Sequence, residues 1–170
     1  LVLMGGIILF AGLSIFAATL FEVIKFSKKK WGPAELWLIN GLFWSIIAGA
    51  LYLAVAVRMA VDSSPIGYAP LNEPLIYVAL FGFINSFIFG VSARAVRGFL
   101  VLKPMYQNLN RLALLLTQLG LMMFIIGVFF DLEQSVASSG LILLAIGTLT
   151  FVYALRVLEP GNGSVRRFSV

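Results

Sequence analysis

The chain has 170 residues, of which 61% are hydrophobic and only 11% are charged, and its formal net charge is +5. A soluble domain carries roughly a quarter charged residues, so this composition excludes an ordinary globular protein. The sequence contains no cysteine and no histidine, which excludes disulfides, thiolate metal sites and the commonest side-chain ligand of haem, copper and zinc.

Charged residues divide the chain into five uncharged stretches, at residues 1–21, 36–57, 74–93, 112–130 and 134–155. About 20 apolar residues suffice for a transmembrane helix, and in hydrocarbon the backbone must be satisfied within each helix. We therefore predict an all-α fold, a bundle of five transmembrane helices. The expected helices cover about 1–24, 36–60, 75–97, 111–130 and 138–157 of a single domain over 1–170. Because the first residue is leucine, we also expect this domain to belong to a longer or a processed chain.

Lysine and arginine gather in alternate loops. They follow the first and third predicted helices and occupy the C-terminal tail: Lys25, Lys28, Lys29, Lys30; Arg94, Arg97, Lys103, Arg111; Arg156, Arg166, Arg167. The other two loops carry acidic residues instead, and Arg58, the one exception, lies one turn from Asp62. Cytoplasmic loops are enriched in cations. We therefore expect the basic loops and the C-terminus in the cytoplasm, and a bacterial or archaeal plasma membrane as the location.

The loops between the helices contain interfacial and helix-breaking residues. Trp31 and Trp37 flank the Gly32-Pro33 pair, and we expect both tryptophans at the depth of the aromatic belt. The loop after the second helix holds Pro65, Pro70 and Pro74, which predict a surface turn. The segment "GFLVLKPMYQNLN" predicts a short connector along the inner interface.

Small residues recur at helical spacing within the predicted spans. In lipid, such residues allow helix backbones to approach closely. We expect the second and third helices to cross at two series with steps of four: Gly41, Ser45, Gly49 and Gly82, Ser86, Gly90. The last two helices carry pairs at steps of seven: Gly120, Gly127 and Gly140, Gly147.

Polar residues within the spans are candidates for contacts between helices. Asn85, Asn40 and Gln118 are expected to join helices through hydrogen bonds, with ligand contact as the alternative. At the end of the third helix, Arg94, Arg97 and Lys103 could contact a lipid phosphate or another anion. The alternative for these cations is an anchor at the cytoplasmic interface.

The run "GFINSFIFGVSARAVRGFL", residues 82–100, resembles a segment of the NnrS family of polytopic membrane proteins. The shared pattern is a glycine-containing helix that ends in Gly-Val-Ser-x-Arg and is followed by a Gly-Phe pair. The matching positions are Gly90, Arg94, Gly98 and Phe99. The resemblance implies a link to haem, copper and nitric-oxide stress. Since the chain lacks histidine and cysteine, the resemblance also implies that this protein is a fragment of such a protein or a relative without that cofactor chemistry.

Three functions remain open from the sequence. The first is a non-catalytic subunit or scaffold of a larger membrane assembly, respiratory or otherwise energy-converting, that binds lipid or quinone. The second is an NnrS-like haem or copper protein, and the third is a small-solute transporter. The first is favoured because the sequence shows no catalytic or metal-binding residues. Expected partners are membrane lipids and other membrane subunits, and not nucleic acid; no cofactor is predicted beyond a bound lipid or quinone.

Overall fold

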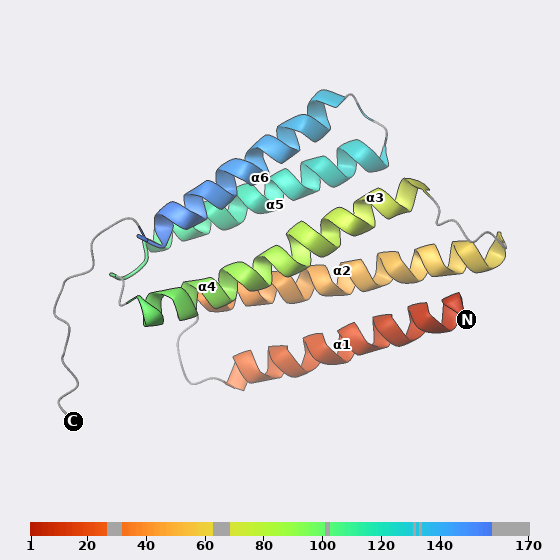
Figure 1. The fold of residues 1–170 in the computed structure, drawn as a ribbon, viewed down its shortest axis with the longest axis horizontal. Coiled ribbons are helices and arrows are strands. Elements are labelled where there is room, and N and C mark those ends of the chain that lie inside the picture. Colours follow the sequence, from red (N-terminus) through yellow and green to blue (C-terminus); the bar gives the residue numbers. More distant parts are fainter. Residues whose placement is uncertain (27–31, 63–68, 101–102, 131, 133, 158–170) are drawn as a thin grey trace.

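The computed structural model describes residues 1–26, 32–62, 69–100, 103–130, 132 and 134–157. Within these ranges the chain is helical and contains no strand (Figure 1). Five helical spans are long and apolar enough to cross a membrane, which confirms the predicted fold class. The elements are α1 (Val2–Phe26), α2 (Pro33–Val61), α3 (Ala69–Tyr77), the π-helix η1 (Val78–Ile84), α4 (Asn85–Phe99), α5 (Gln107–Phe129) and α6 (Gln134–Ala154).

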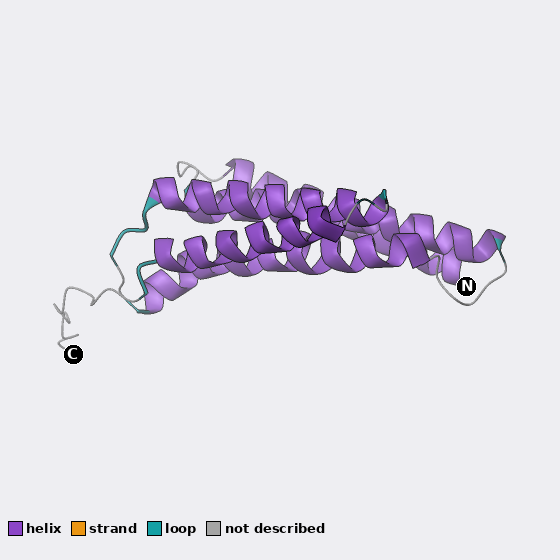
Figure 2. Ribbon diagram, turned by 90° about the horizontal axis from the view of Figure 1, so that it is seen from above, coloured by secondary structure: helices purple, strands orange, loops and turns teal. Residues whose placement is uncertain are grey.

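Consecutive spans run in opposite directions along one long axis, with α3, η1 and α4 forming a single continuous span (Figures 1 and 2). The N-terminus, the ends of α2 and α5 and the starts of α3 and α6 lie at one end of the bundle. The ends of α1, α4 and α6 and the starts of α2 and α5 lie at the other (Figure 1). We call this second end the basic end, since five described cations lie there: Lys25, Arg94, Lys103, Arg111 and Arg156. The described cations that flank alternate helices therefore meet at one end of the bundle.

The central helix is α2, which packs against α1, the third span and α5. Helices α5 and α6 share the most extensive contact, whereas α1 packs mainly on α2. Near the basic end, the rings of Phe89 and Phe151 stack with centroids 4.1 Å apart, and Trp37 meets both edge-on. This buried aromatic cluster joins α2, α4 and α6.

Glycines set how closely the helices approach. A Cβ added at Gly41 would lie 2.6 Å from the Phe87 ring, and one added at Gly82 would lie 2.7 Å from the Trp44 ring. Gly90 similarly faces Leu38, so these three glycines lie in the contact between α2 and the third span. Gly49 differs from the expectation, because its nearest neighbours are Phe10 and Leu13 of α1. The buried Ser45 donates within its own helix, to the carbonyl of Leu42 at 2.7 Å.

The closest backbone approach lies between α5 and α6. A Cβ on Gly120 would lie 2.6 Å from the carbonyl oxygen of Gly140, and one on Gly147 would lie 2.8 Å from the amide nitrogen of Thr117. At the basic end, the amide of Tyr106 donates to the carbonyl of Ala154, and the guanidinium of Arg156 lies 4.4 Å from the centroid of the Tyr106 ring. The two helices therefore pack as one pair along their whole length.

Two expectations about the loops are wrong. The third span begins at Ala69, so Pro70 and Pro74 lie within a helix and not in a surface turn. The span then passes through η1, where the amide of Asn85 donates to the carbonyl of Leu80, five residues earlier. The Trp37 ring faces the protein core with 0% exposure and does not face lipid, since it fills the contact among α2, α4 and α6. Trp31 and Pro65 lie outside the described residues.

Candidate functional site

A groove at the basic end runs between α2 and α4 beside Arg94. Its floor is apolar, and its volume is about 530 Å³. Gly98 leaves space there, since nothing lies within 4 Å of a Cβ added at that position. We call it the Arg94 groove; it is lined by Leu38, Gly90, Val91, Arg94, Ala95, Gly98 and Phe99. The groove thus combines an apolar floor with one cationic side chain at its rim.

Glu35 is the acidic neighbour of this groove. Its Oε1 lies 3.9 Å from an Arg94 guanidinium nitrogen, and its Oε2 accepts the backbone N–H of Gly32 at 2.9 Å. The second contact caps the start of α2, where amides have no partner within the helix. The Arg94 side chain is 64% exposed, and an exposed pair at this distance contributes less than about 1 kcal/mol. The guanidinium therefore stays available for an anionic group of a ligand.

Two tryptophans of α2 donate hydrogen bonds to two amides of α5. Trp37 Nε1 donates to Asn110 Oδ1 at 2.8 Å, and Trp44 Nε1 donates to Gln118 Oε1 two turns deeper. Trp37, Trp44 and Asn110 are each at most 1% exposed. An unpaired indole N–H or amide oxygen at such depth would carry a full desolvation penalty. These bonds therefore fix both the distance and the register between α2 and α5.

Asn40 and Ser86 form the polar contact between α2 and the third span. Asn40 Nδ2 donates to Ser86 Oγ at 2.8 Å, and Ser86 is buried. Asn85, for which this role is expected, is half-buried and forms no side-chain hydrogen bond to any described residue. The interhelical bond thus lies one residue further along, on the face that carries Gly82 and Gly90.

The predicted cation cluster is only partly assembled within the described chain. Arg94 lines the groove, whereas the half-buried Lys103 is not among its lining residues. Arg97 belongs to α4, but its side chain lies outside the described residues. Sequence reasoning overlooked Asn110 and the bonding role of the tryptophans. Their spacing could have indicated this role. Trp37 and Trp44 are seven residues apart, and Asn110 and Gln118 are eight apart, so each pair lies on one helix face.

Within the described part of the chain, no group of three or more histidine, cysteine, aspartate or glutamate side chains could hold a metal ion. The fold and these contacts define a polytopic helical membrane protein in which three side-chain hydrogen bonds join α2 to its neighbours. Comparison of the chain with protein-family models, curated proteins and solved structures finds no match. The resemblance to the NnrS family therefore stays a prediction from residues 82–100 alone.

Proposed function

We propose that the chain is a non-catalytic integral membrane subunit of a larger assembly and that it holds an anionic lipid in the Arg94 groove. The observation that carries the lipid-binding part is the composition of that groove. An acyl chain suits the apolar floor beside Val91 and Phe99, and a phosphate suits the exposed guanidinium of Arg94. Arginine binds phosphate oxygens through paired, charge-assisted hydrogen bonds. The groove lies at the basic end, where lipid headgroups border the spans.

The position of α1 supports the role as a subunit. It is the least buried of the five spans, and it contacts the bundle mainly through α2. Gly5 and Gly12 lie on its exposed surface, with nothing within 4 Å of an added Cβ. Transmembrane helices associate through such small residues. A helix of another subunit could therefore pack against this face at short distance.

Native mass spectrometry of the protein purified from its own membrane tests the lipid. We expect one anionic phospholipid to be retained by the wild type and lost from Arg94→Gln and from Gly98→Leu. The second variant fills the groove without a clash, since Gly98 has open space. The matched control is Arg58→Gln, which removes a cation at the opposite end. Equal lipid retention in all three variants would contradict the assignment, and a retained quinone would replace phospholipid as the ligand.

The same preparation tests the subunit role. We expect other membrane proteins to co-purify with the wild type and to be lost from the double variant Gly5→Leu, Gly12→Leu. That variant leaves the fold intact, because neither new side chain meets an atom of this chain within 4 Å of its Cβ. If no protein co-purifies with the wild type, the chain is not a subunit and this part of the proposal fails.

A further inference from the structure

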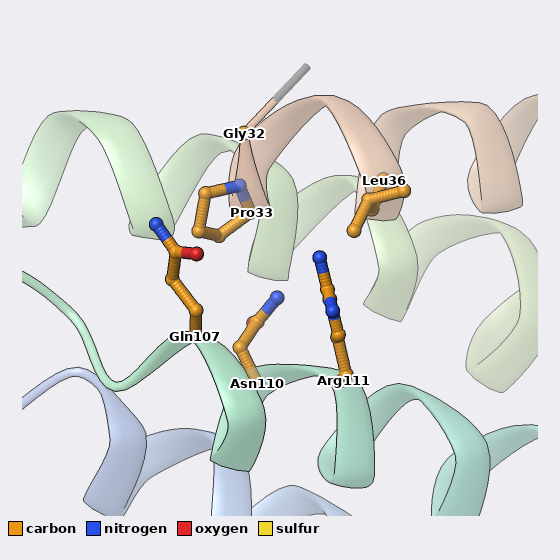
Figure 3. A pocket seen from close by; sticks show the side chains of 6 residues that line it. All are labelled: Gly32, Pro33, Leu36, Gln107, Asn110 and Arg111. Carbon is orange, nitrogen blue, oxygen red and sulfur yellow. The ribbon is translucent and has the colours of Figure 1, made fainter. Parts of the chain in front are cut away.

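A second, smaller pocket lies at the basic end between the starts of α2 and α5 (Figure 3). Its volume is about 40 Å³. A single water needs roughly 10–15 Å³, and pockets for drug-sized molecules reach about 300–1,000 Å³. The pocket therefore has room for one small ion and excludes larger ligands. It is lined by Gly32, Pro33, Leu36, Gln107, Asn110 and Arg111, and it shares none of these residues with the Arg94 groove.

The amide of Asn110 presents its donor side to this pocket. An indole N–H can only donate, so the bond from Trp37 requires the Asn110 oxygen to face Trp37. The Nδ2 group consequently points the other way, into the space beneath Pro33 (Figure 3). Asn110 is 1% exposed, and its Nδ2 forms no hydrogen bond to any described residue. The N–H₂ group therefore opens into the pocket, where it can donate to an acceptor that the protein does not supply.

Arg111 and the two helix starts are positive at this pocket, and the carboxylate of Glu35 lies beside it, bound to the N–H of Gly32 at 2.9 Å. The guanidinium of Arg111 points into the same space (Figure 3), and no described residue forms an ion pair with it. Helices α2 and α5 both begin here, at Pro33 and Gln107. The start of α5 contributes roughly half a positive elementary charge and N–H groups without helical partners. The start of α2 contributes less, because Pro33 has no N–H and the N–H of Gly32 is bound by Glu35. Glu35 is not among the residues that line the pocket, and its Oε1 lies 3.9 Å from a guanidinium nitrogen of Arg94.

We propose that this pocket binds one small anion, either a halide or a phosphate group. The Asn110 Nδ2 group and the Arg111 guanidinium would donate to it, and the two helix starts would add their positive ends. Without an anion, Arg111 and the start of α5 repel each other, and both repel the part of the positive end of α2 that Glu35 does not offset. A bound anion removes that repulsion and so stabilises the contact between α2 and α5. The inference is independent of the proposed lipid and of the proposed subunit role.

Thermal unfolding of the delipidated protein in non-ionic detergent, with gluconate as the bulky counterion, tests this site. We expect chloride or inorganic phosphate to raise the Tm saturably, by roughly 5–10 °C at a hundredfold excess over Kd. Dihexanoyl phosphatidic acid is the parallel probe for a lipid phosphate. A rise with the inorganic ions identifies a free anion, and a rise with the lipid alone identifies a headgroup. No saturable rise with any of the three would overturn the proposal.

Variants distinguish anion binding in this pocket from anion binding at other cationic surfaces of the protein. Asn110→Asp keeps the acceptor for Trp37 and places a carboxylate oxygen where the anion would bind. We expect it to raise the Tm in gluconate and to abolish the response to added anions. Arg111→Gln alters an exposed side chain, so this variant should fold normally. Its Kd for the added anion should be about tenfold higher than that of the wild type. The matched control Arg94→Gln should leave the Kd unchanged. A response to anions in Asn110→Asp equal to that of the wild type would refute the site.

Discussion

Replacing Gly120 by alanine is the sharpest test of how α5 and α6 pack. The new Cβ would lie 2.6 Å from both the carbonyl oxygen of Gly140 and the amide nitrogen of Leu144. Ordinary contact requires about 3.5 Å, so the helices must separate by roughly 0.9 Å. The obstructing atoms belong to the backbone and cannot rotate away. Overpacking costs about 1–3 kcal/mol, and alanine recovers at most about 1 kcal/mol of helix propensity. We therefore expect a net loss of about 1–2 kcal/mol.

Reversible unfolding in mixed detergent and dodecyl sulfate micelles, followed by circular dichroism, measures this loss. The matched control is Gly12→Ala, since no atom lies within 4 Å of a Cβ added to α1 at that position. We expect the control to unfold at the wild-type free energy or slightly above it. If Gly120→Ala is as stable as Gly12→Ala, then α5 and α6 do not approach each other closely and the described packing is incorrect.

Three further predictions concern the polar contacts and the family resemblance. Trp37→Phe removes the indole N–H and leaves the buried oxygen of Asn110 without a donor. The free energy of unfolding should therefore fall by about 1–3 kcal/mol in the same assay. An unchanged value would show that this bond does not stabilise the fold. A double-mutant cycle with Asn40→Leu and Ser86→Ala should give a coupling of about 0.6 kcal/mol, and strict additivity of the two changes would mean that the bond contributes nothing. An absorption spectrum of the pure protein should lack a haem band, because the chain offers no histidine or cysteine ligand; a haem band in stoichiometric amount would instead support the NnrS-like alternative.

The number of spans was predictable because charge is so costly in hydrocarbon. Each uncharged stretch marks one helix, and every observed span contains most of its predicted range. The bounds were less predictable. Helix α2 begins at Pro33 and includes Glu35, since that carboxylate caps the first turn instead of ending the helix. Helix α5 likewise extends back to Gln107, four residues before the first predicted position. Polar residues near the end of a predicted span therefore do not mark where the helix itself begins.

The polar contacts were predictable only in part. Polar residues inside a span need hydrogen-bond partners, and this requirement predicted contacts by Asn40 and Gln118. The sequence does not indicate which residues those partners are. Ser86, not Asn85, meets α2, and successive helical residues point about 100° apart, so one position decides the outcome. The π-helix before Asn85 further alters the register in a way that no local pattern in the sequence announces. Trp37 had two compatible environments, lipid interface or protein core, and only tertiary packing decides between them.

The central claim is a bundle that crosses the membrane five times with its basic end in the cytoplasm. The chain has no cysteine, so single cysteines can be placed at the exposed positions Asp62 and Asn108, at opposite ends of the bundle. We expect a membrane-impermeant maleimide added to intact cells to label Asp62→Cys, and to label Asn108→Cys only after the membrane is permeabilised. Labelling of both positions from the same side would contradict the five-span bundle, and the reversed pattern would contradict the cytoplasmic placement of the basic end.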